Sequence, residues 1–198
     1  MSVYQTAYFP SLAYVRALAH DPTPLIEIHE HFVKQSIRTR CEIITANGIL
    51  QLNVPIIHES GHKLAIKDCQ IDYSKNWISD HWRALESAYA NAPHFEHYAH
   101  DLDAIFRQKP SHLIALNASI WEWLAQCLGF DTTLQYSSVY LGKTTSDKKE
   151  WLGRQKEISR EYQQLFNSQE GFTENLSVLD GLFNEGPLLR NLFLPLHL

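Results

Sequence analysis

The chain has the length of a single domain and the composition of a folded protein. It has 198 residues, of which 44% are hydrophobic and 20% charged, which excludes an intrinsically disordered chain and predicts one domain over residues 1–198. Lys and Arg number 17 against 22 Asp and Glu, giving a net charge of -5. Proteins that bind nucleic acid neutralise its phosphates with a basic surface, so we expect no nucleic-acid partner.

Cysteine usage and the N-terminal segment predict where the protein resides. Cys41, Cys69 and Cys127 are widely separated and form no CxxC pair, which disfavours a disulfide framework and a four-thiolate zinc site. Free thiols are typical of a reducing cytoplasm. The first residues lack the basic and apolar regions of a signal peptide, and no run reaches the roughly 20 apolar residues of a membrane span. We therefore expect a cytoplasmic protein without a membrane span.

The N-terminal part of the chain predicts strands separated by turns. β-Branched, aromatic and alternating apolar residues predict strands over residues 2–9, 25–33 and 65–73. Ser11 predicts the N-cap of a short helix. Residues 41–45 and 49–57 predict a β-hairpin, with Asn47-Gly48 as its turn.

The remainder predicts mainly helices. Apolar residues spaced by three and four predict helices over 79–91, from Pro93 onward, and over 113–127, the last ended by Gly129. A strand is expected over 132–141, a charged and exposed excursion over 142–160, and a short final helix closed by Gly186-Pro187. The sequence therefore predicts an α/β fold, with mixed α+β as the alternative. A strand-rich N-terminal half with a β-hairpin would carry a helical C-terminal half packed on the sheet.

Three groups of histidines have spacings that suggest metal ligands: His58 with His62, His94 with His97 and His100, and His29 with His31 beside Glu27. The first pair forms H-E-x-x-H, which binds zinc only on a helix, whereas its internal Ser-Gly predicts a turn. The second group diverges around a predicted helix and indicates a solvated face. The third shares one strand face, which either a metal or a border with solvent would explain. We expect no bound metal, and the sequence identifies no cofactor and no oligomeric state.

A cluster of cations stands out in this acidic chain. Lys34, Arg38 and Arg40 lie within seven residues, and in an extended segment their side chains would point the same way. Such a patch suits a phosphate or carboxylate, which arginine contacts in a bidentate manner. The alternative is an edge strand protected from aggregation by charge.

Two further titratable residues have both a structural and a functional interpretation. His81 has apolar residues at i+4 and i+7, so its ring should point inward, as a hydrogen-bonded core histidine or as a general base. Asp180 follows Ser177 at the spacing of a helix-capping pair, yet it also lies in a polar group with Asn175 and Glu185. The chain contains no G-x-S-x-G, glycine-rich phosphate loop or Rossmann fingerprint.

Several long segments are distinctive when they are taken together in chain order. They include KQSIRTRC, HWRALESAYANAPHF and NLSVLDGLFNEGP, which begin at Lys34, His81 and Asn175. From Tyr8 to Pro187, these segments resemble the motifs of the WbqC-like protein family. The chain departs from the family pattern in three places: Thr39 replaces an Asn, Gly181 replaces a Leu, and Asp147-Lys148-Lys149 stand where D-F-R is frequent.

The resemblance implies a place in glycan synthesis. WbqC-like proteins are similar to proteins encoded with polysaccharide and O-antigen genes, and glycyl, other aminoacyl or acyl transfer has been suggested for some. By family motif and residue chemistry, the candidate catalytic residues are His81 and Asp180. The candidate ligand-binding residues are Tyr8, Lys34, Gln35, Ser36, Arg38, Arg40, Trp82, Asn175 and Glu185.

The leading hypothesis is a cytoplasmic transferase that acts on a sugar or sugar-nucleotide intermediate, with an anionic small molecule as its partner. Lys34, Arg38 and Arg40 would hold its phosphate or carboxylate, and His81 or Asp180 would be the general base. The alternative is a non-catalytic carbohydrate-binding or partner protein of the same pathway. A nucleotidyl transferase, suggested only by the strand, Tyr-Phe-Pro and helix at the start, is a third hypothesis. A transferase of the first kind requires these five residues around one cavity.

Overall fold

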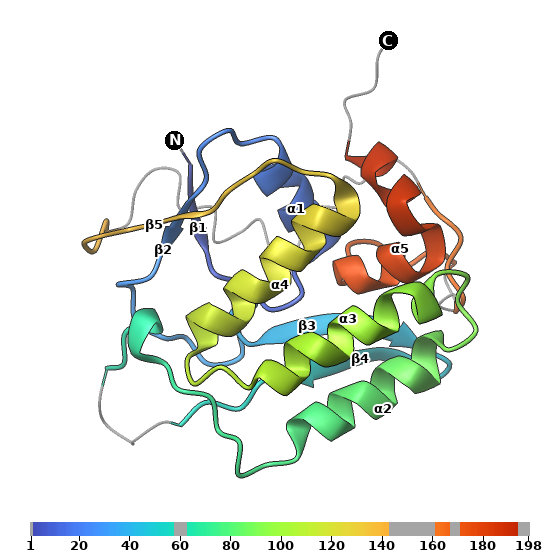
Figure 1. Ribbon diagram of the computed structural model, residues 1–198, viewed down its shortest axis with the longest axis horizontal. Helices are drawn as coiled ribbons and strands as arrows, with labels where there is room; N and C mark the ends of the chain where they lie inside the picture. The colour runs from blue at the N-terminus through green and yellow to red at the C-terminus, as the bar shows by residue number, and fades with distance from the viewer. Residues whose placement is uncertain (1, 58–62, 143–160, 167–170, 194–198) are drawn as a thin grey trace.

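A computed structural model describes residues 2–57, 63–142, 161–166 and 171–193 (Figure 1). The elements in chain order are β1 (Val3–Gln5), α1 (Leu12–Ala19), β2 (Leu25–Glu27), β3 (Arg40–Thr45), β4 (Gly48–Asn53), the 3₁₀ helix η1 (Ile66–Asp68), α2 (Trp77–Tyr89), α3 (Phe95–Gln108), α4 (Leu113–Leu128), β5 (Gln135–Tyr136), α5 (Val178–Glu185) and the 3₁₀ helix η2 (Gly186–Leu192). The fold is α/β as predicted, with most strands and a hairpin in the N-terminal half and most helices in the C-terminal half.

The strands form two separate sheets. β1, β2 and β5 make a parallel sheet in the order β1-β2-β5, in which Ile26 lies opposite both Tyr4 and Tyr136. α1 joins β1 to β2, because parallel neighbours need a crossover rather than a tight turn. β3 and β4 make an antiparallel hairpin, in which Cys41 lies opposite Leu52.

The hairpin turn lies one residue earlier than predicted. Thr45 pairs with Gly48, so the two turn residues are Ala46 and Asn47 rather than Asn47 and Gly48. Gly48 begins β4 with φ of 102°, a backbone conformation that glycine adopts without steric cost. The glycine is therefore needed at the start of the strand and not inside the turn.

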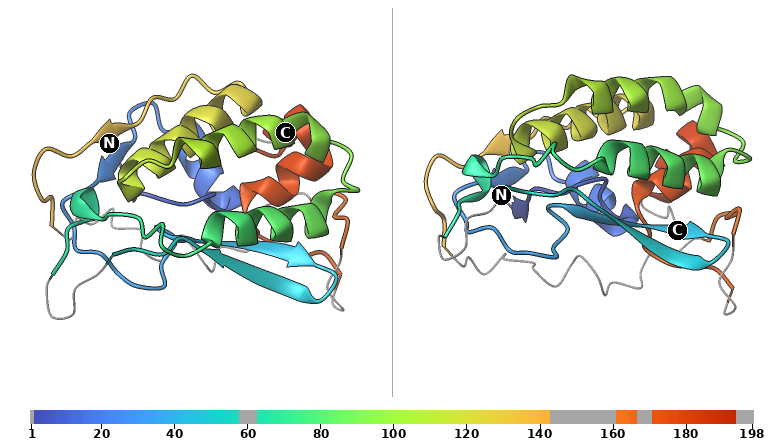
Figure 2. Two further views of the ribbon diagram at one scale, coloured as in Figure 1. Left: turned by 60° about the horizontal axis from the view of Figure 1, so that its bottom comes forward. Right: turned by 90° about the horizontal axis from the view of Figure 1, so that it is seen from below.

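The helices lie together on one side of the hairpin, as Figure 2 shows. α2 and α5 contact β3, and α3 packs on both α4 and α5. Helix α4 follows its predicted pattern, because its buried side chains recur every three or four residues: Leu113, Leu116, Ile120, Leu124 and Leu128. It ends at Gly129, whose φ of 64° provides the left-handed C-cap.

The strand predicted over residues 65–73 is wrong. Ile66–Asp68 form a single 3₁₀ turn, and the neighbouring backbone bonds to separate segments. The N–H of Phe32 donates to Leu64, that of Ile57 to Gln70 and that of Ile71 to Ser111. The apolar residues are thus buried one or two at a time, without a continuous ladder. The strands predicted over 2–9, 25–33 and 132–141 shorten to 3, 3 and 2 residues.

Two predicted segments lie outside the described residues: the H-E-x-x-H pattern at 58–62 and, except for its first residue, the charged excursion at 142–160. In the described part of the chain, every helix is too short or too polar to cross a membrane.

Gly181, one of the departures from the family pattern, lies where α5 packs against η2. A Cβ atom there would lie 2.5 Å from Cδ1 of Leu189 and 3.2 Å from Cδ2 of Leu12. Since Leu189 is wholly buried, it occupies the space that a larger residue at 181 would need.

Gly181→Leu is expected to lower the free energy of unfolding by ~1–3 kcal/mol through overpacking, measured by urea denaturation. Leu189→Ala in the same chain should recover part of the loss, and an unchanged stability of Gly181→Leu alone would contradict this packing.

Candidate functional site

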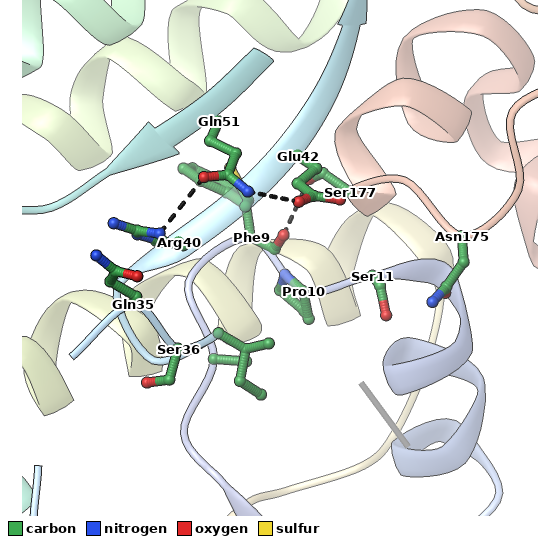
Figure 3. Close-up of a pocket in the computed structure, with 13 residues that line it drawn as sticks. Phe9, Pro10, Ser11, Gln35, Ser36, Arg40, Glu42, Gln51, Asn175 and Ser177 are labelled. Carbon is green, nitrogen blue, oxygen red and sulfur yellow. Dashed lines mark hydrogen bonds between the residues drawn. The ribbon is translucent and has the colours of Figure 1, made fainter. Parts of the chain in front are cut away.

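A pocket at the meeting point of four segments gathers polar side chains (Figure 3). Its volume is about 130 Å³, and its walls are formed by Ala7, Phe9, Pro10, Ser11, Gln35, Ser36, Ile37, Arg40, Cys41, Glu42, Gln51, Asn175 and Ser177. We call it the Arg40 pocket. Sites that enclose drug-sized ligands start at roughly 300 Å³, so this pocket suits a small group or one end of a larger ligand.

The backbone around the Arg40 pocket is unusual. Phe9, Gln35 and Asn175 have φ values of 37°, 58° and 55°, and in the described ranges Lys109 is the one other non-glycine residue with positive φ. Such conformations cost ~1–3 kcal/mol each and persist where surrounding structure enforces them, often at functional sites. Three segments far apart in sequence therefore each place a strained residue at this pocket.

Two helices begin at the Arg40 pocket. Ser11 is the N-cap of α1 and Ser177 is the N-cap of α5, as the sequence predicted for Ser11. The loops that carry them are joined, because the Ser177 hydroxyl donates to the Phe9 carbonyl at 2.9 Å and the Ala13 N–H donates to Oδ1 of Asn175 at 3.1 Å. The positive ends of two helix dipoles thus lie beside the pocket and favour an anion there.

Arg40 brings a cationic side chain to the pocket wall. Its guanidinium donates to two neutral amides, Asn53 at 3.2 Å and Gln51 at 3.4 Å. The Gln51 amide in turn donates to Glu42 at 2.8 Å. Within the described part of the chain Arg40 forms no ion pair, so its charge is not neutralised by direct contact.

Burial raises the pKa of the neighbouring Cys41 thiol, which keeps it protonated and disfavours it as a nucleophile.

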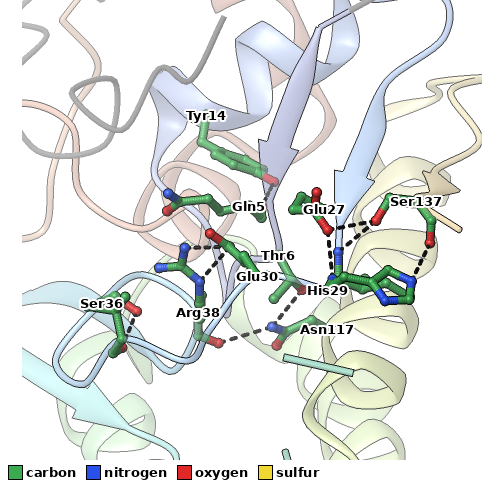
Figure 4. A network of polar contacts seen from close by, with 12 residues as sticks. Gln5, Thr6, Tyr14, Glu27, His29, Glu30, Ser36, Arg38, Asn117 and Ser137 are labelled. Carbon is green, nitrogen blue, oxygen red and sulfur yellow. Dashed lines mark hydrogen bonds and ion pairs between the residues drawn. The ribbon is translucent and has the colours of Figure 1, made fainter. Parts of the chain in front are cut away.

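The predicted cationic patch is not formed, because residues 34–39 are turns rather than an extended segment. The Ser36 carbonyl accepts the N–H groups of both Thr39 and Arg40, which reverses the chain. Lys34 is consequently exposed and outside the pocket walls, whereas Arg38 is only 2% exposed and forms an ion pair with Glu30 (Figure 4). Only Arg40 of the three cations reaches the pocket.

His81 points inward, as predicted, but away from the Arg40 pocket. Its Nδ1 lies 2.8 Å from the buried hydroxyl of Tyr8. The Trp77 ring packs edge-on against the imidazole, with the two ring centroids 5.1 Å apart. Burial lowers the pKa of His81 to about 4, against a smaller raising effect of a hydrogen bond with the Asn53 backbone. The ring is therefore neutral at pH 7, and neither it nor Tyr8 lines the pocket. Neighbouring Trp82 is half-buried and packs on Phe95 instead.

Asp180 is fully buried and lies off the pocket walls. Its carboxylate accepts hydrogen bonds from Tyr89 at 2.9 Å, from Gln164 at 3.0 Å and from Tyr162. Burial raises its pKa, and these three donors oppose that effect. Ser177 caps α5 through the Leu179 N–H, while the Asp180 side chain serves this network rather than the cap. Glu185, at the end of the same helix, is also outside the pocket walls.

Glu27 is buried rather than on a polar strand face. Its carboxylate accepts the Ser137 hydroxyl at 2.8 Å and the N–H of His29 at 2.7 Å (Figure 4). It also accepts the N–H of Leu141 at 2.8 Å. It thus links β2 to the segment after β5.

No group of three or more His, Cys, Asp or Glu residues in the described ranges is arranged to hold a metal ion.

The structure brings four of the predicted residues together at the pocket: Gln35, Ser36, Arg40 and Asn175. Sequence reasoning missed Glu42 and Gln51. The signals for them were present, since Arg40 and Glu42 are two residues apart on a strand and Gln51 lies opposite Glu42 across the hairpin.

Comparisons with known proteins match the chain to a protein family and to an uncharacterized relative. The model of the WbqC-like protein family matches residues 5–158. Uncharacterized protein Rv1507c of Mycobacterium tuberculosis is 28% identical over 141 residues, which cover 71% of this chain and 61% of that relative. The match therefore spans less than two thirds of the relative's length. No solved structure matches the chain.

Proposed function

The chain belongs to the WbqC-like protein family, and we propose from this premise that it is a transferase of surface polysaccharide or O-antigen synthesis that binds an anionic intermediate in the Arg40 pocket. The ligand would be a sugar or sugar nucleotide, or the donor of a glycyl, other aminoacyl or acyl group. The site of action would be the cytoplasm, since free cysteines are typical of a reducing compartment.

The observation that supports an anionic ligand is that the Arg40 guanidinium bonds to uncharged partners at the pocket wall. Its guanidinium has amides rather than carboxylates as direct partners, and the N-termini of α1 and α5 add positive potential at the same place. A phosphate or carboxylate would receive a charge-assisted hydrogen bond from this side chain. The small volume suits the charged end of the ligand, with the rest outside.

Group transfer also needs a base, and the pocket offers one candidate in place of His81 and Asp180. Glu42 lines the pocket, and Gln51 binds its Oε1, which orients the carboxylate. As an acceptor hydroxyl or amine attacks the donor's acyl carbon, Glu42 would take its proton and later return it to the leaving group.

The alternative is a non-catalytic carbohydrate-binding or partner protein of the same pathway. The separation of His81 and Asp180 from the pocket favours it over a mechanism based on those two residues. Turnover of a bound donor, absent in Glu42→Gln, would distinguish a transferase from a binding protein.

We expect one class among sugar nucleotides, acyl-CoAs and amino acids to stabilise the protein in a thermal-shift screen. At a ligand concentration 100-fold above Kd, linkage predicts about 2.7 kcal/mol of stabilisation. Arg40→Gln should remove most of this shift, because it removes the charge but keeps a hydrogen-bonding side chain.

Arg83→Gln is the matched control, since Arg83 is exposed on α2 and away from the pocket walls. It should leave the shift unchanged. A ligand whose shift is equal in wild type and Arg40→Gln does not use this pocket, and the absence of any shift across the screen would count against the proposed ligand classes.

A further inference from the structure

The buried carboxylate of Asp180 is the centre of a network that reaches across the fold. It receives hydrogen bonds from Tyr89 of α2 and from Tyr162 and Gln164, which belong to a segment with no regular structure. Tyr162 and Gln164 are themselves buried. The carboxylate therefore fixes the position of the Gln164 side chain relative to α5 and α2.

Gln164 extends this network to the backbone of Thr173. Its Nε2 donates to the Thr173 carbonyl at 2.9 Å, and its Oε1 accepts the Thr173 N–H at 2.9 Å. An amide side chain that bonds both backbone groups of one residue holds that residue as a strand neighbour would. The ring of Tyr162 packs edge-on against Phe172 at 5.0 Å and supports the same loop.

Thr173 precedes by two residues the strained Asn175 of the Arg40 pocket. Asn175 accepts the Ala13 N–H on Oδ1 at 3.1 Å. Asparagine tolerates a φ of 55° better than other non-glycine residues do, and the flanking chain supports this conformation at Asn175. On the C-terminal side, Ser177 provides the fixed point through Phe9; on the N-terminal side, Thr173 does so through Gln164.

We propose that Asp180 is a positioning residue for the Arg40 pocket: through Gln164 and Thr173 it holds Asn175 in the conformation that completes the pocket wall. Its role as a binding determinant rests on the proposed function, because only a ligand in this pocket would sense Asn175. Asp180 itself need not touch that ligand.

Hydrogen exchange of single amides tests the positioning without any ligand. Asp180→Asn and Gln164→Met should accelerate exchange of the Thr173 and Ala13 amides roughly three- to tenfold more than that of the α4 amides, which report global stability. Gln164→Met is the milder variant, since it keeps the side-chain volume. Asn184→Ala is the control, because Asn184 bonds the Asp180 carbonyl and not its carboxylate. Equal acceleration at all amides would overturn the proposal.

A double-mutant cycle tests the consequence for binding, with inorganic pyrophosphate as the probe. Gln164→Met should raise Kd roughly three- to tenfold, and it should have no further effect in the Asn175→Ala background. Independent, additive effects would show that Gln164 does not act through Asn175. If wild type fails to bind pyrophosphate, the proposed anion site loses its support, whereas the exchange pattern still decides whether Asp180 positions the loop.

Discussion

Glu30→Gln is expected to lower the free energy of unfolding by ~3–5 kcal/mol, as measured by urea denaturation at pH 7. Arg38 is 2% exposed and its partner Glu30 is 12% exposed, so the guanidinium is buried and its carboxylate partner is largely shielded from solvent. Both Nε, at 2.9 Å, and Nη2 of Arg38 donate to Oε1 of Glu30. Without the carboxylate, the buried Arg38 guanidinium would have no compensating charge. An uncompensated buried charge is the main reason why removing one partner of such a pair destabilises the fold.

The double variant Glu30→Gln/Arg38→Met separates this cost from the loss of packing. It should be more stable than Glu30→Gln alone, because no unpaired charge remains buried. An exposed pair, Asp103 with Arg107 on α3, provides the comparison, and Asp103→Asn should change stability by less than ~1 kcal/mol. A similarly small effect of Glu30→Gln would contradict the buried pair.

Acidification from pH 6.5 to about 4 is expected to cost about 3 kcal/mol of folding free energy through His81 alone. The unfolded chain binds a proton on this ring near pH 6.5, whereas the folded ring, with its pKa lowered by burial to about 4, does not. The unfolded state therefore holds more protons in this window, and stability falls as pH falls. Asp80 is the charged group that acts on the ring, and it opposes the shift.

The difference in unfolding free energy between wild type and His81→Gln isolates this contribution. Other titrating groups cancel in the difference, including Asp180, whose raised pKa favours the folded state at low pH instead. Glutamine keeps an acceptor for the Tyr8 hydroxyl. Chemical denaturation at pH 7.5 and pH 4 should show wild type losing about 3 kcal/mol more than His81→Gln, and parallel pH profiles would contradict a neutral buried ring.

Periodic patterns made the helices predictable, whereas the strands depended on distant partners. The Leu and Ile repeat of α4 and the glycine at 129 determine a helix from local sequence alone. Residues 65–73 have equally apolar composition, yet their backbone bonds go to residues near 31, 56 and 112. Strand composition does not identify those partners, so the strand prediction failed there.

The site residues that could be predicted are those whose own chemistry or motif indicated a ligand, without knowledge of the fold. Arg40 was predicted because arginine suits a phosphate or carboxylate, and Asn175 because it lies in a polar segment that resembles a family motif. The turns over residues 34–39, in which Gln35 has positive φ, direct Arg38 to Glu30 and leave Arg40 at the pocket. Nothing in the alternation of side chains predicts those turns. Glu42 was missed because an exposed strand carboxylate is common, and its relevance arises only once the loop of Ser177, whose N–H donates to the Glu42 carbonyl, is brought beside it.

The contact between Ser177 and Phe9 joins positions 168 residues apart. Closing so long a loop costs entropy that must be offset by contacts made elsewhere first, and contacts of large sequence separation slow folding. The Arg40 pocket should consequently be among the last features to form, after the hairpin and the local helices. Its presence would then mark completion of folding, and a chain still emerging from the ribosome would have no binding site until α5 had been synthesised.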